Sequence, residues 1–182
     1  MLGAAAALAA TLVPLRRARG HTPYRQWDVF RKRYLLILTS RSDAEGDAIG
    51  DAWVALLRER LPLSRAMVSR ARDMLRVASL LRTDQAKLAV LSHADARAMS
   101  AGEPPHEEYG PMPLQLMIDN GTHVLVVRGD FPLHHGYLIT VSLLERAQQL
   151  HLSVPLEGKF GMAVHPGARA AALGEELDEP RS

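Results

Sequence analysis

Residues Tyr34–Leu61, YLLILTSRSDAEGDAIGDAWVALLRERL, decide the fold. The run Leu35–Leu38 is short and apolar at every position, which predicts a strand buried on both faces. The polar turn Thr39–Asp43 follows, and beyond it apolar residues recur at intervals of three and four, which predicts a helix with one buried stripe. The apolar positions of this helix are Ala44, Ala48, Ile49, Ala52, Trp53, Leu56, Leu57 and Leu61.

The turn itself has the chemistry of an anion site. Ser42 and Glu45 have the spacing of a capping box, in which each side chain accepts from a free N–H at the helix start. A strand that turns sharply into a helix directs its remaining N–H groups beyond the strand end, which suits a bound anion. A plain strand–helix unit with a good cap and no ligand would show the same pattern, so both interpretations stay open here.

Composition limits the function classes. The 182 residues suffice for one domain with a proper core, and the net charge is only +2. The basic residues are concentrated in the first third and have no interleaved aromatic residues for base stacking, so no nucleic-acid partner is expected. The absence of cysteine excludes disulfides, thiolate metal sites and cysteine nucleophiles.

The N-terminus resembles an export signal. Leu2–Leu15 is alanine- and leucine-rich, too short for a membrane span, and as long as the apolar part of a signal peptide. It is typical of the middle of a twin-arginine signal whose arginine pair lies upstream of a late start at Met1. We therefore predict an export signal at 1–20, a basic lead-in at 21–33 and a periplasmic location. An apolar helix that stays on the protein is the alternative.

Two further strand–helix units follow the first. Ala66–Ser69 predicts a strand and Asp73–Leu81 a helix, and Lys87–Leu91 predicts a third strand. Ser92 is placed to cap a third helix, with Asp95 in a second arrangement like a capping box. The connections are too short for anything but a parallel sheet.

The C-terminal half begins with a Gly/Pro-rich acidic loop at Ala101–Met112. Asn120-Gly121 between two apolar runs is the strongest short signal for a hairpin. The elements expected here are strands at Leu114–Ile118 and His123–Val127, a long helix over Leu133–Leu150, an irregular stretch at Val154–Val164 and a short helix starting at His165-Pro166-Gly167. The sequence thus predicts one α/β domain at 34–168, a mostly parallel sheet flanked by helices, and an acidic tail at 169–182.

Ligands of parallel α/β sheets bind beyond the carboxyl ends of the strands. Hydroxyl groups, helix N-termini and arginines that converge on one rim suit a carboxylate or similar anion. The alternative is that the serines only cap helices and the arginines only face water. The predicted ligand-binding residues, at the ends of the first three strands, are Thr39, Ser40, Arg41, Ser42, Ser69, Arg70, Ser92 and His93.

Metal, cofactor and enzyme signals are weak. His134 and His135 are adjacent, so on a helix they do not form a chelating pair, and no zinc motif occurs. No nucleophile elbow, P-loop or dinucleotide fingerprint is present. We expect no metal, no cofactor and no enzyme activity; a Ser/His/Asp hydrolase is the weakest hypothesis.

The segment Ala86–Asp95, AKLAVLSHAD, resembles the third strand of the TAXI family, the solute-binding subunits of TRAP transporters. His123–Glu145, with RGDFPL before a long helix, and His165–Ala168, HPGA, are similar to the family's C-terminal segments. The resemblance covers Tyr34–Ala168 and implies one lobe of a type II periplasmic-binding-protein fold. It places ligand contacts on Thr39–Ser42, Ser92 and His93.

Two features differ from that family: its first turn is glycine-rich, and its members have two lobes. Here about thirty residues connect the third helix to the C-terminal segment, too few for a second lobe. The expected function is an extracytoplasmic solute-binding protein for a small organic acid, with TRAP membrane subunits as partners and a homodimer to supply a second wall. The alternative is a degenerate lobe that acts as a protein-interaction or sensor module. The sequence does not specify the solute or the transporter.

Overall fold

The protein, as a computed structural model, is described over residues 34–177. The predicted export signal and basic lead-in lie outside the described residues. The strands are β1 (Leu36–Ser40), β2 (Met67–Ala71), β3 (Leu88–Ser92), β4 (Leu114–Asp119) and β5 (His123–Arg128). The helices are α2 (Ala44–Arg60), α3 (Met74–Arg82), α4 (His93–Ala101), α5 (Leu133–Leu144), α6 (Ala147–Leu150) and α7 (Pro166–Leu173), with 3₁₀ turns at Pro62–Ser64 and Glu107–Tyr109.

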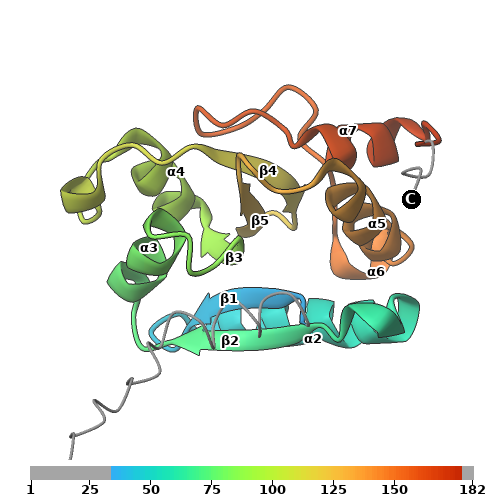
Figure 1. Ribbon diagram of the computed structural model, residues 1–182, viewed down its shortest axis with the longest axis horizontal. Helices are drawn as coiled ribbons and strands as arrows, with labels where there is room; N and C mark the ends of the chain where they lie inside the picture. The colour runs from blue at the N-terminus through green and yellow to red at the C-terminus, as the bar shows by residue number, and fades with distance from the viewer. Residues whose placement is uncertain (1–33, 178–182) are drawn as a thin grey trace, which may run out of the picture.

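The five strands form one mixed sheet in the order β2-β1-β3-β5-β4 (Figure 1). β1 lies parallel to β2 and β3, which confirms the predicted strand–helix units. β5 runs antiparallel to both β3 and β4, so the sheet is mixed rather than mostly parallel in its pairing. The carboxyl ends of β1, β2, β3 and β4 therefore share one edge of the sheet with the start of β5.

The hairpin predicted at Asn120-Gly121 is confirmed. Gly121 has φ +96°, a conformation in which a side chain would be strained. The Asn120 side-chain oxygen accepts hydrogen bonds from the N–H groups of Thr122 (3.1 Å) and His123 (2.8 Å). This local chemistry turns the chain so that β5 pairs with both β4 and β3.

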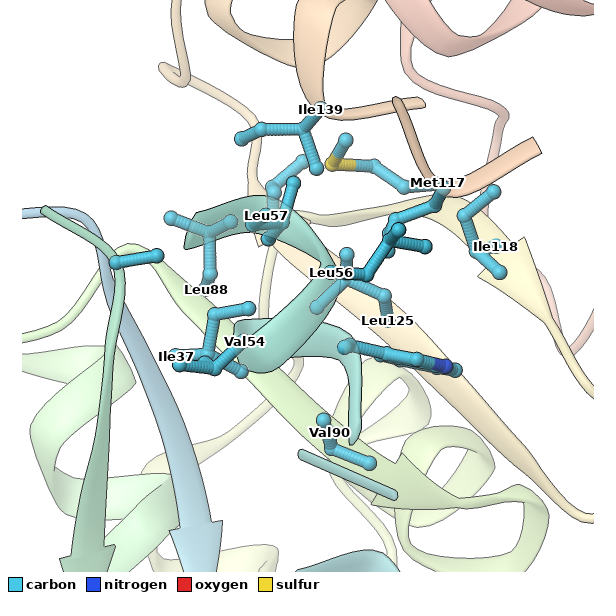
Figure 2. Packing of buried hydrophobic residues seen from close by; sticks show 14 of the residues in the cluster. Ile37, Val54, Leu56, Leu57, Leu88, Val90, Met117, Ile118, Leu125 and Ile139 are labelled. Carbon is cyan, nitrogen blue, oxygen red and sulfur yellow. The ribbon is translucent and has the colours of Figure 1, made fainter. Parts of the chain in front are cut away.

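Helices cover both faces of the sheet, and a buried apolar cluster lies under each face (Figure 1). Alternate residues of a strand point to opposite faces, so Ile37 of β1 joins one cluster and Leu38 the other. Trp53 and Leu57 of α2, at 1% and 0% exposure, pack on the first face. Figure 2 shows this cluster, to which Ile37, Val54, Leu56, Leu57, Leu88, Val90, Met117, Ile118, Leu125 and Ile139 belong. α3 and α4 cover the second face.

Three element bounds differ from the prediction. β2 continues to Ala71, so Ser69 and Arg70 lie inside the strand and not in the turn after it. The predicted helix over Leu133–Leu150 is two helices. The α-helical bonding pattern stops at Arg146, whose N–H bonds to the carbonyl of Leu143, three residues earlier (3.1 Å). α7 continues past residue 168 to Leu173.

α5 and α7 cross at very close range, and two glycines permit it. A Cβ on Gly167 would lie 2.2 Å from the Leu133 carbonyl oxygen, and one on Gly136 would lie 2.2 Å from the His165 ring. His165, 1% exposed, caps α7: its Nδ1 accepts from the Gly167 N–H (3.2 Å) and its Nε2 donates to the Phe131 carbonyl (3.0 Å). Burial lowers the pKa of His165, and the bond to Phe131 opposes this only in part.

No helix within residues 34–177 combines the length and the apolar character needed to cross a membrane.

Candidate functional site

The turns after β1 and β3 meet at the hairpin that begins β5. Ser92 at the end of β3 is paired in register with His123 at the start of β5. The hydroxyl of Thr122 donates to the Glu45 carboxylate of α2 (3.0 Å), and its carbonyl accepts from the N–H of His93 (3.2 Å). The hairpin therefore holds the beginnings of α2 and α4 at one edge. We call this region the polar edge: Ser40–Glu45, Ser92–Asp95, Asp119–His123 and Lys159–Phe160.

The β1 turn is held by its own side chains. The hydroxyls of Ser40 and Ser42 lie 2.8 Å apart, and the Ser40 hydroxyl also accepts from the Ser42 N–H (3.2 Å). α2 is capped by Asp43, whose carboxylate accepts from the Gly46 N–H (3.0 Å). The predicted Ser42–Glu45 capping box is therefore wrong by one residue, and the Ser42 hydroxyl stays at the exposed rim.

His123 joins the two turns. Its ring is 4% exposed, its Nε2 lies 3.1 Å from the Asp43 carboxylate, and its Nδ1 lies 2.9 Å from the Thr122 hydroxyl. A carboxylate only accepts, so Nε2 is the donor to Asp43. This bond spans 80 residues and fixes the N-terminus of α2 against β5.

The β3 turn was predicted correctly. Ser92 caps α4 by accepting from the Asp95 N–H (3.1 Å), and its hydroxyl donates to the Asp95 carboxylate (2.6 Å). The hydrogen bond from His106 (3.2 Å), more than the opposing effect of burial, lowers the pKa of Asp95. The carboxylate is therefore ionised and fully engaged with its neighbours.

His93 forms a wall of the polar edge. Its Nε2 donates to the buried Asp119 (2.9 Å), and its ring packs against Phe160 with 4.9 Å between centroids. Burial raises the pKa of Asp119, but hydrogen bonds from Lys159 (2.7 Å), the Gly121 N–H (2.7 Å) and His93 outweigh it and lower the pKa overall. Within the described chain the Nδ1 of His93 has no hydrogen-bond partner, so in the neutral ring it is a free acceptor.

Arg41 is an exposed cation at this edge. Its backbone N–H bonds to the Ala71 carbonyl (2.9 Å), which fixes the residue at the end of the sheet. Its guanidinium makes no hydrogen bond or ion pair with any residue in the range 34–177, and the residue is exposed. A guanidinium in this condition can bind a carboxylate bidentately.

Three of the eight predicted ligand-binding residues lie elsewhere. Thr39, 0% exposed, donates to Asp47 of α2 (2.6 Å). Arg70 is held by Asp47 (2.8 Å) and Asp51 (2.6 Å) on the face under α2. Ser69 is paired with Leu38 inside the sheet. The structure thus brings the turns with Ser40–Ser42 and Ser92–His93 to one edge, whereas Thr39, Ser69 and Arg70 are engaged within the sheet and under α2; the charge of Arg41 still acts on Asp47.

The sequence reasoning missed four side chains that shape the polar edge: Asp119, His123, Lys159 and Phe160. For His123 a signal existed, because the Asn-Gly hairpin fixes it as the first residue of β5. Lys159 and Phe160 arrive from the irregular stretch after α6, for which the sequence offers no periodic pattern. Across residues 34–177 no group of three or more His, Asp or Glu side chains is arranged to hold a metal ion.

Comparison with known proteins found no protein family whose pattern the sequence matches and no matching curated protein.

Proposed function

We propose that the protein is a solute-binding domain with a single wall, which holds the carboxylate of a small organic acid at the polar edge. The observation that carries this proposal is the exposed Arg41, which makes no hydrogen bond or ion pair within 34–177 and lies in the same turn as the exposed Ser42 and the start of α2. An exposed arginine without a hydrogen-bonded partner, in the same turn as an exposed hydroxyl, provides the charge and the fork of donors that a carboxylate requires.

The N-termini of two helices add positive electrostatic potential at the polar edge. α2 has 17 residues and α4 has nine, and both begin at the polar edge. Their first-turn N–H groups and aligned peptide dipoles favour negative charge beyond the strand ends. Asp43, Asp95 and Asp119 lie in the same region, and each is hydrogen-bonded to a histidine.

The opposite side of the edge suits the rest of the solute. The contacting rings of His93 and Phe160, tilted by 49° to each other, offer an apolar surface for a short carbon chain. The Nδ1 of His93, which has no partner within 34–177, can form a hydrogen bond with a polar substituent on the acid.

The hydroxyl groups support binding rather than hydrolysis. The Ser92 hydroxyl donates to the Asp95 carboxylate (2.6 Å). Among the described residues no histidine accepts a hydrogen bond from it. Thr122 lies beside His123, but its hydroxyl donates a hydrogen bond to the Glu45 carboxylate (3.0 Å). Neither hydroxyl is therefore activated as a nucleophile.

The resemblance to TAXI subunits adds the transport role: an extracytoplasmic subunit that presents its solute to TRAP-type membrane proteins. A single wall leaves the solute exposed on one side, so these membrane proteins or a second copy of the chain would supply the other side. A one-walled site predicts weak binding, with Kd of about 0.1–1 mM.

Isothermal titration calorimetry of the full chain at pH 7 tests the proposal with acetate, lactate, succinate and glutamate as probes. We expect binding of at least one acid, weakened about tenfold or more in Arg41→Gln. Arg72→Gln is the matched control, because Arg72 is also exposed but pairs with Asp73 (2.6 Å). If no acid binds the folded chain, or if the two variants bind alike, the proposal fails.

A further inference from the structure

The outer side of β2 is open in the described chain. The backbone groups of Met67 and Ala71 face β1. The Met67 N–H donates to the Leu35 carbonyl (2.9 Å), and the Ala71 carbonyl accepts from the Arg41 N–H (2.9 Å). In a strand, alternate residues direct their backbone groups to opposite sides, so those of Val68 and Arg70 point away from β1. No residue from 34 to 177 pairs with them. Unpaired strand edges of this kind favour addition of another strand.

The opposite edge of the same sheet is covered by the chain itself. The N–H of Leu116 in β4 bonds to the Ala163 carbonyl (2.9 Å), and Asp119 and Ser153 exchange two backbone bonds of 2.8 Å each. Residues from the stretch after α6 thus cover β4, whereas β2 has no such cover among the described residues.

A hollow of about 310 Å³ lies beside the open edge, between β2 and α2. Its lining combines four apolar residues with three charged ones, Asp51, Arg58 and Arg70. The lining residues are Asp51, Val54, Ala55, Arg58, Met67, Val68 and Arg70.

We propose that residues 25–30 of this chain, RQWDVF, add to β2 as an antiparallel strand and place Trp27 and Val29 in this hollow. The position of the chain supports this occupant. The Leu35 N–H donates to the Ser64 carbonyl (2.9 Å) and the Leu35 carbonyl accepts from the Met67 N–H (2.9 Å), so the described chain begins beside the amino end of β2.

The length and the pattern also fit. Crossing two strand spacings requires about 10 Å, which the three residues 31–33 span when extended. Six residues then cover about 20 Å, enough for the five residues of β2. Trp27 and Val29 are two apart and so share one face of a strand.

Amide hydrogen exchange of the full chain tests the proposal. We expect the Val68 and Arg70 amides to exchange at least about tenfold more slowly than in the double variant Trp27→Asp/Val29→Asp. Gln26→Ala, on the other face of the same segment, is the control and should leave their protection unchanged. If both amides exchange rapidly in the unchanged chain, or equally in the double variant, the proposal is overturned.

A disulfide provides a second, independent readout, because the chain has no cysteine of its own. Val29→Cys/Val68→Cys should form an intrachain disulfide on mild oxidation, whereas Val29→Cys/Arg169→Cys should not. A disulfide between two chains, or protection that rises with protein concentration, would mean that a second copy occupies the edge and would overturn the proposal.

Discussion

The ends of β1 and β2 lie side by side, and each has an arginine that behaves differently. Thr39 is paired in register with Arg70, and Ser40 with Ala71. Arg70 lies inside its strand on the side facing α2, where Asp47 and Asp51 neutralise it. Arg41 lies one residue beyond its strand, where its charge attracts Asp47 only from a distance, and it makes no hydrogen bond or ion pair within 34–177. One arginine therefore stabilises the fold, and the other is free for a ligand.

The largest stability loss is expected at the β1 end, from Asp43→Ala. The change removes the cap of α2 and leaves the buried His123 Nε2 without its acceptor, so unfolding should require about 2–3 kcal/mol less. Urea denaturation followed by circular dichroism measures this. Asp43→Asn keeps a good cap and should lose less; an equal loss in both variants would contradict the capping role.

At the β2 end, Asp47→Ala should cost about 1–2 kcal/mol by the same measurement. The buried Thr39 hydroxyl would lose its acceptor, and Arg70 would lose one of its two carboxylates. Asp51→Ala is the matched control, because Asp51 is 58% exposed and its pairing is screened by water, so its loss should stay below about 0.5 kcal/mol. An equal loss of stability in Asp51→Ala and Asp47→Ala would mean that the hydrogen bond from the buried Thr39 to Asp47 adds nothing to the stability of the fold.

The stability of the β2 end should also depend on acid pH. Burial raises the pKa of Asp47, but bonds from Thr39 and Arg70 outweigh this and hold it below its ordinary value of 3.8. A carboxyl group with a lowered pKa stabilises the fold above pH 3.8, and this contribution is lost as the pH falls through the folded-state value. The stability difference between the unchanged chain and Asp47→Asn should therefore narrow between pH 5 and about pH 3. A constant difference would contradict the ion pair.

The smallest effect is expected from Ser42→Ala, within about 0.5 kcal/mol of the unchanged chain, because Ser42 does not cap α2. Ser92→Ala is the comparison, and it should cost about 1 kcal/mol because Ser92 does cap α4. Thermal unfolding of both variants checks this. A larger loss of stability in Ser42→Ala would support the Ser42–Glu45 capping box predicted from the sequence.

Local signals predicted most of the fold. The three strand–helix units, the Ser92 cap and the Asn120-Gly121 hairpin depend on residues within a few positions of one another, and the structure confirms them. The Ser42 cap was wrong because Ser42 and Asp43 are both good capping residues, and the sequence does not distinguish a start one residue later.

The candidate site was less predictable, because its contacts span long distances along the chain. Arg70 contacts Asp47 and Asp51 across 23 and 19 residues of sequence. Those contacts decide that Arg70 is not available to bind a ligand. His123 reaches Asp43 across 80 residues. The break between α5 and α6 has no proline or glycine to announce it, so the sequence predicted one helix there.

Chemical-shift mapping by NMR, with the acid that binds most tightly, tests the central claim most directly. The account predicts that the amides of Arg41–Glu45 and His93–Asp95 shift as the acid is added, while those of Arg70–Asp73 do not. It also predicts that Arg41→Gln abolishes the shifts and that Arg70→Gln preserves them. Shifts centred on Arg70–Asp73, or shifts that survive Arg41→Gln unchanged, would contradict it.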